Sequence, residues 1–188
     1  MAALSLALLG SLQVTIAGRA AKFKSDKARA LLAYLGVEAS RPQRREILMG
    51  LLWPESTEDV ARHNLRQTLY ALRQAISDPT AQPPYLFISR DEIQFNSASD
   101  YALDVVIFNA LLAACDAHPH ENIESCLACA ERLRQAVNLY RGEFLAQFFL
   151  DDSAAFEEWP WVQRERLHRR ALDSLTQLAD YYSERLWD

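Results

Sequence analysis

The chain has 188 residues, half of them hydrophobic, and a formal net charge of -5 at pH 7. This length and composition indicate a globular protein with one large domain or two small ones. No apolar run reaches the roughly 20 residues that span a bilayer, and the apolar start lacks the basic leader of a signal peptide, which argues against a membrane protein and predicts a cytoplasmic location. Three cysteines, an odd number, argue against the disulfide framework of small secreted proteins.

Charge is distributed unevenly along the chain. Residues 1–100 contain 12 lysines and arginines against 10 acidic residues, whereas residues 101–188 contain 8 against 15. The first half is therefore slightly basic and the second half is strongly acidic. Because phosphate binding depends on local rather than total charge, the acidic total leaves room for a nucleic-acid binder whose contacts lie in the first half.

Short strands and two helices are expected before residue 55. Residues 4–23 alternate apolar and polar positions between glycine turns, which predicts two or three short strands. A helix over residues 25–38 follows, capped by Ser25, with these buried positions: Ala28, Leu31, Leu32 and Leu35. A second helix over residues 43–52 is predicted to end before Pro54 and to bury four residues: Ile47, Leu48, Leu51 and Leu52.

A third helix is predicted over residues 57–77. Ser56 and Asp59 have the spacing of a capping box, and the Asp78-Pro79 pair marks the end of the helix. Its buried stripe is expected to consist of Leu65, Leu69, Leu72 and Ile76. The other faces then carry mostly basic and amide side chains: Arg62, His63, Arg66, Gln67, Tyr70, Arg73 and Gln74.

Residues 85–96 predict a β-hairpin, because two alternating stretches flank a tight turn with Arg90 at its tip. Short strands, three helices and a hairpin, in this order, are typical of a winged helix-turn-helix. In that fold the third helix can enter the major groove of DNA while the hairpin contacts the adjacent backbone.

Beyond a boundary at residues 97–100 every periodic segment is helical, and no strand is expected. Helices are predicted over residues 104–117, over 122–140 and from Ser153 onward, and Pro160 is expected to break or kink the last one. Their inward positions are predicted to be Val105, Phe108, Leu111 and Leu112, then Leu127, Ala130, Leu133 and Val137, and finally Leu167, Ala171, Leu175, Leu178 and Tyr182. The expected fold is mainly α with small β elements: a winged helix at 1–98, then an all-helical, tetratricopeptide-like domain at 99–188.

Six phrases of the sequence occur in a fixed order: "KARALLAYL", "RREILMGLLWPES", "ARHNLRQTLYALRQAI", "LDVVIFNALLAAC", "LYRGEFLAQF" and "FEEWPWVQRERLHRRALDSLTQLADYY". Together they closely resemble bacterial transcriptional regulators of the AfsR/SARP type, in which an OmpR-like winged helix precedes a bacterial transcriptional activator domain. The resemblance implies a sequence-specific activator that binds double-stranded DNA, with RNA polymerase contact or a homodimer on DNA as roles for the helical domain. Many members continue into an ATPase or further repeats, so whether this chain is a fragment stays open.

The expected DNA contacts lie mainly on the third helix. We expect Asn64, Arg66 and Gln67 to read base edges, because arginine pairs with guanine and side-chain amides pair with adenine. Arg62, His63 and Tyr70 share the same outer surface. Phosphate contacts, which orient a protein without reading sequence, are expected from Arg73, Arg90, Arg44, Arg45 and Lys27. The alternative for the arginines is an ordinary solvated helix face.

A cysteine and histidine cluster has two interpretations. Its members are Cys115, His118, His120, Cys126 and Cys129. They have the spacing to supply tetrahedral zinc ligands between the end of one helix and the start of the next. A lone CxxC is a weak signal, however, and cysteines at helical spacing are also typical of a packed, metal-free turn, which we favour.

Catalysis and cofactor binding have no motif in this sequence. It lacks a glycine-rich phosphate loop and a Ser/His/Asp pattern, so neither an enzyme nor a bound cofactor is expected. The remaining alternative is a protein-interaction module of a larger signalling ATPase that does not bind DNA. Such modules tend to replace the basic and amide groups of the third helix with apolar or acidic ones, and here the basic and amide groups are present.

Overall fold

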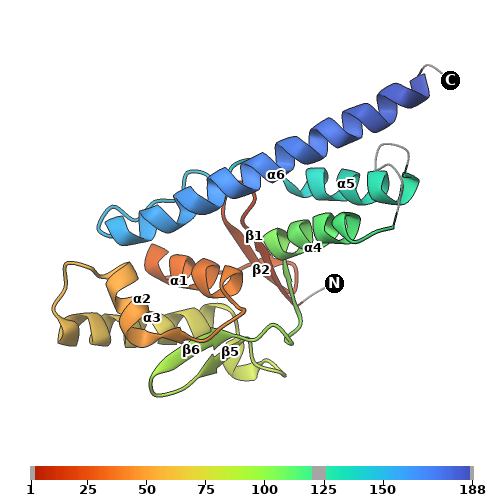
Figure 1. The fold of residues 1–188 in the computed structure, drawn as a ribbon. Helices are drawn as coiled ribbons and strands as arrows, with labels where there is room; N and C mark the ends of the chain where they lie inside the picture. The colour runs from red at the N-terminus through yellow and green to blue at the C-terminus, as the bar shows by residue number, and fades with distance from the viewer. Residues whose placement is uncertain (1–2, 120–125, 187–188) are drawn as a thin grey trace. The chain divides into compact units, whose positions relative to one another are not determined.

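The computed structural model describes residues 3–119 and 126–186 of the chain (Figure 1). The fold is mainly α-helical with small sheets, which confirms the predicted fold class at this level. The chain forms two compact units, each assembled from separate stretches of sequence. The first unit comprises Met1–Leu6, Gln13–Leu103 and Phe148–Pro160; the second comprises Ala7–Leu12, Asp104–Gln147 and Trp161–Asp188.

The strands near the start of the chain belong to a four-stranded sheet. In sheet order these strands are β3 (Arg19–Ala20), β2 (Gln13–Ile16), β1 (Leu4–Ala7) and β7 (Tyr101–Leu103). Strand β7 pairs in parallel with β1, with Leu4 opposite Tyr101. The prediction that no strand follows residue 100 was therefore wrong. Three residues are too short to show alternation, and β7 exists because a distant segment supplies its partner.

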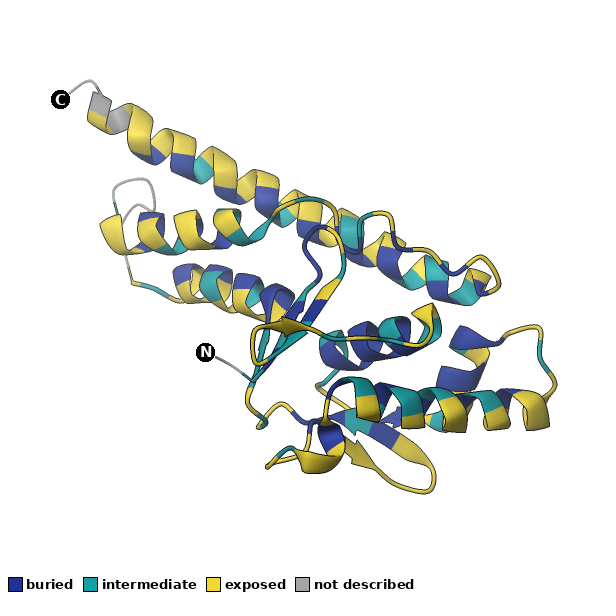
Figure 2. Ribbon diagram, turned by 180° about the vertical axis from the view of Figure 1, so that it is seen from behind, coloured by how far each residue is buried: buried dark blue, intermediate teal, exposed yellow. Residues whose placement is uncertain are grey.

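Helix α1 (Asp26–Val37) lies at the centre of the first unit. Ser25 caps it by accepting a hydrogen bond from the amide of Ala28 at 3.3 Å, as predicted. Figure 2 shows this helix buried along most of its length, and the predicted inward positions are buried. Aromatic residues from the stretch Phe148–Pro160 also pack on α1: the ring of Trp159 meets Tyr34 at a centroid distance of 5.1 Å.

Helix α2 (Arg45–Leu52) is shorter than predicted. Gln43 begins a two-residue strand, β4 (Gln43–Arg44), which pairs with the hairpin instead of starting the helix. Leu48 is buried, but Ile47 is 55% exposed, contrary to expectation. The buried face of α2 is formed by Leu48, Met49 and Leu52, and because successive residues point about 100° apart, Ile47 falls outside this face.

Helix α3 (Glu58–Ala75) has the predicted buried stripe, which extends into its C-cap residue Ile76. The capping box was wrong. The helix begins after Thr57, one residue later than Ser56 would require, and the Thr57 side chain makes no capping bond within the described residues. Glu58 and Asp59 lie in the first turn, where their negative charges interact favourably with the positive end of the helix dipole and stabilise the helix.

The predicted hairpin consists of β5 (Leu86–Ile88) and β6 (Glu92–Phe95), and Arg90 lies in the turn between them. Strand β4 adds to β6, which makes a three-stranded sheet in the order β4-β6-β5. The strand that leads into α2 therefore belongs to the same sheet as the hairpin.

The carboxylate of Asp78 connects α3 to the hairpin. Ser77, with a left-handed φ of 57°, turns the chain out of α3 into a short 3-10 helix, η1 (Asp78–Thr80). The Asp78 side chain is fully buried, and it accepts hydrogen bonds from the Arg73 Nε at 2.7 Å and from the amides of Tyr85 and Leu86 at 2.8 and 3.0 Å. The end of the helix and the start of β5 are therefore held by the same group.

The second unit contains α4 (Asp104–Asp116) and α5 (Leu127–Leu139), which pack against each other, and most of α6 (Ala154–Leu186) (Figure 1). Helix α6 continues through Pro160, so the expected break was wrong, and a kink at this residue stays a prediction. Pro160 lies near the start of α6, and the turns after it keep their own amide donors. The predicted start of α5 at residue 122 lies outside the described residues, which resume at Cys126. Within the described residues, no helix is long and apolar enough to cross a bilayer.

The inward faces of α5 and α6 differ in part from the predicted ones. Leu127 is 72% exposed and sits at the first position of α5. On α6, Leu175 and Tyr182 are exposed, whereas the preceding residues Ser174 and Tyr181 are buried. The buried stripe of α6 therefore uses a polar residue, which a pattern of hydrophobic residues alone cannot reveal.

A second buried carboxylate organises the second unit. Asp104 accepts hydrogen bonds from the amides of Leu8 and Leu9 and pairs with Arg141 at 2.9 Å. Burial raises the pKa of the Asp104 carboxyl, and the amide donors and Arg141 oppose this effect. These bonds connect the stretch Ala7–Leu12 to the start of α4.

The buried stripe of α3 predicts that truncating one of its leucines leaves a cavity and lowers the stability of the protein. Leu72→Ala should lower the free energy of unfolding by about 2 to 5 kcal/mol, because Leu72 is fully buried and its truncation leaves a cavity. Val60→Ala on the same helix is the control and should have little effect, since Val60 is half exposed. Urea denaturation followed by circular dichroism measures both. Equal stability of the two variants would contradict the observed packing.

Removal of Arg73 is expected to lower the stability for a different reason, the loss of an ion pair. Arg73→Ala leaves the buried Asp78 carboxylate without its counter-charge and should cost about 2 to 4 kcal/mol. The control is Arg169→Ala, which removes an exposed pair with Glu165 and should leave the unfolding midpoint nearly unchanged. Thermal melts compare the two variants. An Arg73→Ala protein as stable as the control would show that Asp78 does not need the guanidinium.

Candidate nucleic-acid interface

The outer surface of α3 carries the side chains that the sequence assigned to it. The leucine stripe of α3 faces the core, and the other side of the helix is exposed (Figure 2). The exposed side carries Arg62, His63, Arg66, Gln67 and Tyr70. Asn64, the third expected base reader, is half-buried. Helix α3 is about 27 Å long for its 18 residues, and a helix of ordinary diameter fits the width of the major groove.

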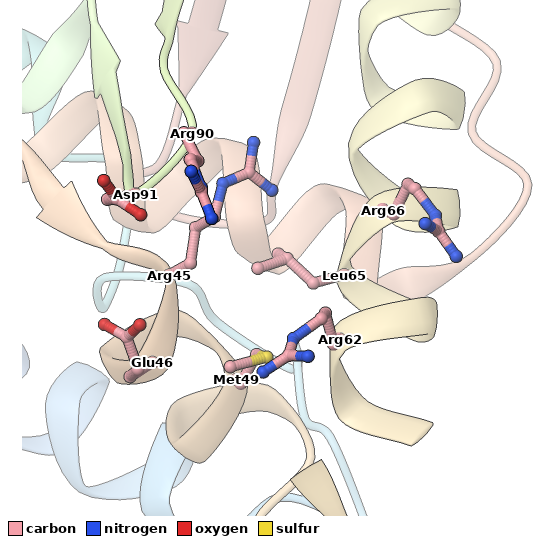
Figure 3. A pocket seen from close by; sticks show the side chains of 8 residues that line it. All are labelled: Arg45, Glu46, Met49, Arg62, Leu65, Arg66, Arg90 and Asp91. Carbon is pink, nitrogen blue, oxygen red and sulfur yellow. The ribbon is translucent and has the colours of Figure 1, made fainter. Parts of the chain in front are cut away.

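A hollow of about 450 Å³ lies between α3, the start of α2 and the hairpin turn (Figure 3). Four arginines and two acidic residues line it together with two apolar residues: Arg45, Arg62, Arg66, Arg90, Glu46, Asp91, Met49 and Leu65. The arginines come from three elements that are separate in sequence. Their excess over the acidic residues makes the hollow a candidate site for an anion.

Hydrogen bonds fix the hairpin side of this hollow. The Arg45 guanidinium donates to the carbonyl oxygen of Ser89 through Nη2 at 3.0 Å and Nε at 3.3 Å. The start of α2 is thereby tied to the hairpin turn, next to Arg90. Arg44, the N-cap residue of α2, is exposed and has Glu46 3.5 Å away.

The arginines of α3 differ in their partners. Arg62 forms exposed ion pairs with Glu58 and Asp59 in the preceding turn. The Nη2 of Arg66 lies 3.4 Å from the Nδ1 of His63. Exposed ion pairs of this kind contribute little to stability, so Arg62 can exchange its carboxylates for a phosphate at low cost.

Two of the expected phosphate contacts have other partners. Lys27 is only 15% exposed, and its Nζ lies 2.9 Å from Asp152 and 3.2 Å from the Ser153 hydroxyl. It also sits over the ring of Trp53, 5.2 Å from the centroid. Arg73 is bound to Asp78. Neither residue lines the hollow, because each neutralises or caps a group within the first unit.

Sequence reasoning missed the acidic and apolar parts of the hollow. Glu46 and Asp91 at its edge had no role in the expected interface, and Met49 was not considered. Leu65 was recognised only as a member of the α3 stripe. The helical spacing of Leu65 signalled burial, but only the tertiary fold brings it together with Met49 at the same cavity.

The cysteine and histidine cluster is partly assembled in the second unit. One metal-ligand atom from each of His118, Cys126 and Cys129 lies within 4.8 Å of the others. Cys115 is buried beside them, with its Sγ 3.6 Å from the carbonyl oxygen of Cys129. His120 lies outside the described residues. Among the described residues, the cluster could therefore hold a metal ion through three ligands.

Comparisons with known proteins find a family match for the helical part of the chain and a structural likeness for nearly all of it. Residues 103–185 match the family described as Bacterial transcriptional activator domain. A comparison with curated proteins finds no match. Among solved structures, the fold is similar to that of Mycobacterium tuberculosis EmbR in complex with a low-affinity phosphopeptide, with a TM-score of 0.73 and 23% sequence identity.

The likeness to EmbR covers 96% of this chain but 46% of the EmbR chain, so this chain spans less than half the length of that protein. At this identity the likeness shows a shared fold alone. The match to the activator domain includes α4, α5 and most of α6. The helical part of the chain thus matches a bacterial transcriptional activator domain, in agreement with the resemblance found in the sequence.

Proposed function

We propose that the chain is a transcriptional activator of the SARP type that binds specific DNA sequences through α3 and the hairpin. The observation that carries this proposal is the hollow lined by four arginines from α2, α3 and the hairpin turn. The order of its elements, three helices and then a hairpin, is that of a winged helix-turn-helix. The match of residues 103–185 to an activator domain supports the role in transcription.

In the proposed complex α3 lies in the major groove. Arg66 and Gln67 are exposed near the middle of the helix, where they reach base edges, and Asn64 contributes once it turns outward. Arginine can donate two hydrogen bonds to one guanine, and glutamine and asparagine can pair with adenine. His63 and Tyr70 flank these residues on the same surface and contact the groove walls.

Phosphate contacts surround the base readers. Arg62 of α3, Arg45 of α2 and Arg90 of the hairpin turn supply guanidinium groups at the hollow. Arg44, which is exposed next to Arg45, adds a further one. Guanidinium groups bind phosphate oxygens in a fork geometry, which sets the register of a protein on the duplex. Lys27 and Arg73 do not line the hollow and are paired with Asp152 and Asp78, so they are left out of this set.

In this proposal the second unit contacts other proteins once DNA is bound. Its activator domain is the part of the chain for which we propose contact with RNA polymerase or pairing of two copies on DNA. The second unit holds 11 acidic residues against 8 arginines, and this small acidic excess disfavours DNA contact by the unit, because negative charges repel phosphates.

The proposal predicts two kinds of arginine variant. Arg66→Ala should weaken binding to a preferred duplex by about 1 to 3 kcal/mol and reduce the preference for one base, since a base contact is lost. Arg90→Ala should weaken binding to all duplexes alike and reduce the slope of log K against log salt by about one, since a phosphate contact is lost. Fluorescence anisotropy at several salt concentrations measures both, on duplexes that the parent protein selects from random sequences.

Arg169→Ala is the matched control, because Arg169 is an exposed arginine of the second unit. It should bind like the parent protein. If Arg66→Ala and Arg90→Ala also bind like the parent while remaining folded, the arginine face is only a solvated surface. A protein-interaction module then becomes the better account of this unit.

A further inference from the structure

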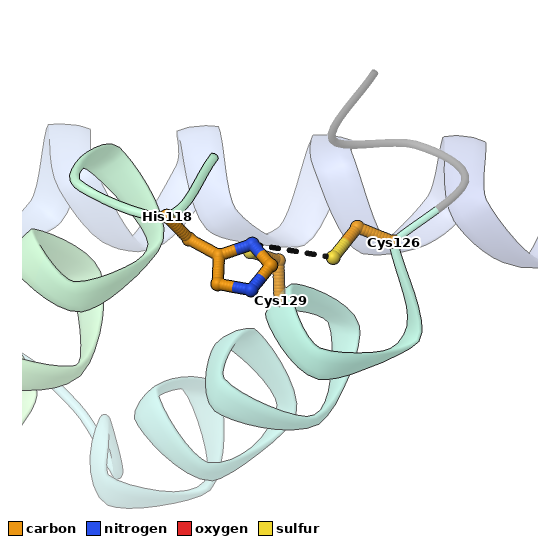
Figure 4. A group of neighbouring side chains, drawn as sticks. All are labelled: His118, Cys126 and Cys129. Atoms are coloured by element: carbon orange, nitrogen blue, oxygen red, sulfur yellow. Dashed lines mark hydrogen bonds between the residues drawn. The ribbon is translucent and has the colours of Figure 1, made fainter. Parts of the chain in front are cut away.

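Three metal-ligating side chains meet where α4 ends and α5 begins, within the second unit. His118 follows the last turn of α4, Cys126 is the N-cap residue of α5, and Cys129 lies in the first turn of that helix. Figure 4 shows the imidazole and the two thiol groups directed toward one another from the two helices. The packing of α4 against α5 brings His118 next to the two cysteines.

The distances suit a tetrahedral ion. The Nδ1 of His118 and the Sγ of Cys126 are 3.7 Å apart, and all three ligand atoms lie within 4.8 Å of one another. With Zn–S bonds of about 2.3 Å and Zn–N bonds of about 2.0 Å, tetrahedral geometry places nitrogen and sulfur about 3.5 Å apart and two sulfurs about 3.8 Å apart. Small side-chain movements therefore complete the geometry.

The surroundings act differently on the two thiols: backbone amides at the start of α5 lower the pKa of Cys126, whereas burial raises the pKa of Cys129. Both cysteines lie at the N-terminus of α5, where the helix dipole stabilises negative charge. The Nη1 of Arg132 lies 3.9 Å from the Cys129 sulfur. Cys129 is fully buried, and His118 and Cys126 are half-buried, so the site is shielded on one side and reachable on the other.

We propose that His118, Cys126 and Cys129 bind one Zn²⁺ ion that joins the end of α4 to the start of α5. Imidazole and thiolate ligands select zinc over calcium and magnesium, which prefer oxygen. The fourth ligand is water or the thiol of Cys115, whose Sγ lies 3.6 Å from the Cys129 carbonyl oxygen. Because α4 and α5 form the packed pair of this unit, the ion stabilises the activator domain rather than the DNA-binding face.

Cobalt substitution tests the site directly. The reduced full chain, freed of metal with a chelator, is titrated with Co²⁺, which should give thiolate-to-cobalt charge-transfer absorption that saturates at about one equivalent and is displaced by Zn²⁺. Cys126→Ser and His118→Ala should each weaken Co²⁺ binding by at least about tenfold. His63→Ala, a histidine exposed on α3, is the matched control and should titrate like the parent.

Circular dichroism verifies that each variant is folded, and thiol alkylation gives a second measure that requires no variant. Saturating Zn²⁺ should slow the alkylation of Cys126, read by mass spectrometry, and raise the melting temperature of the parent. Absence of a charge-transfer band in the parent, or equal bands in the parent and the two ligand variants, would overturn the proposal. An alkylation rate of Cys126 that is unchanged by Zn²⁺ would overturn it as well.

Discussion

The relation between α3 and the hairpin depends on one buried carboxylate. Asp78 needs its lone pairs satisfied, because an ionised group away from water is stable only when it is paired and hydrogen-bonded. Arg73 supplies the charge from the last turn of α3, and the amides of Tyr85 and Leu86 supply donors at the start of the hairpin. The hairpin therefore starts at a fixed place relative to the helix end. Arg45 adds a second tie by donating to the carbonyl of Ser89, so the hollow between helix and turn is built before any ligand arrives.

This construction explains how an acidic chain can carry a basic surface. The arginines that line the hollow are close only because α2, α3 and the hairpin turn converge there. Other cations of the same unit are neutralised within the structure, as Lys27 is by Asp152 and Arg73 by Asp78. The net charge of the chain therefore says little about the field at this surface. For a phosphate at the hollow, the nearby guanidinium groups matter more than the distant acidic residues, whose effect is screened by salt.

The amphipathic patterns of α1 and α3 were the features that the sequence predicted well. The α3 stripe of Leu65, Leu69 and Leu72 is buried because residues three and four positions apart share one face of a helix. Strands of two or three residues, β4 and β7, were missed because their stability comes from partners distant in sequence. Charged residues posed a similar difficulty. The sequence around Lys27 and Arg90 gives no sign that the two differ. In the structure Lys27 contacts the buried Ser153, whereas Arg90 lies in an exposed turn. The cysteine cluster was visible as a pattern, but the sequence could not show that His118 and Cys126 lie 3.7 Å apart.

The central claim is that the outer face of α3 enters the DNA groove, and photo-crosslinking tests it most directly. A benzophenone amino acid replaces Tyr70, which is 63% exposed on α3, or Tyr182, which is 50% exposed on α6. Each protein is irradiated on a duplex that the parent protein selects from random sequences. The account predicts a covalent protein–DNA product from position 70 that maps to the bases of the selected motif, and none from position 182. A product from position 182 alone, or none from position 70 on a duplex that is demonstrably bound, would contradict it.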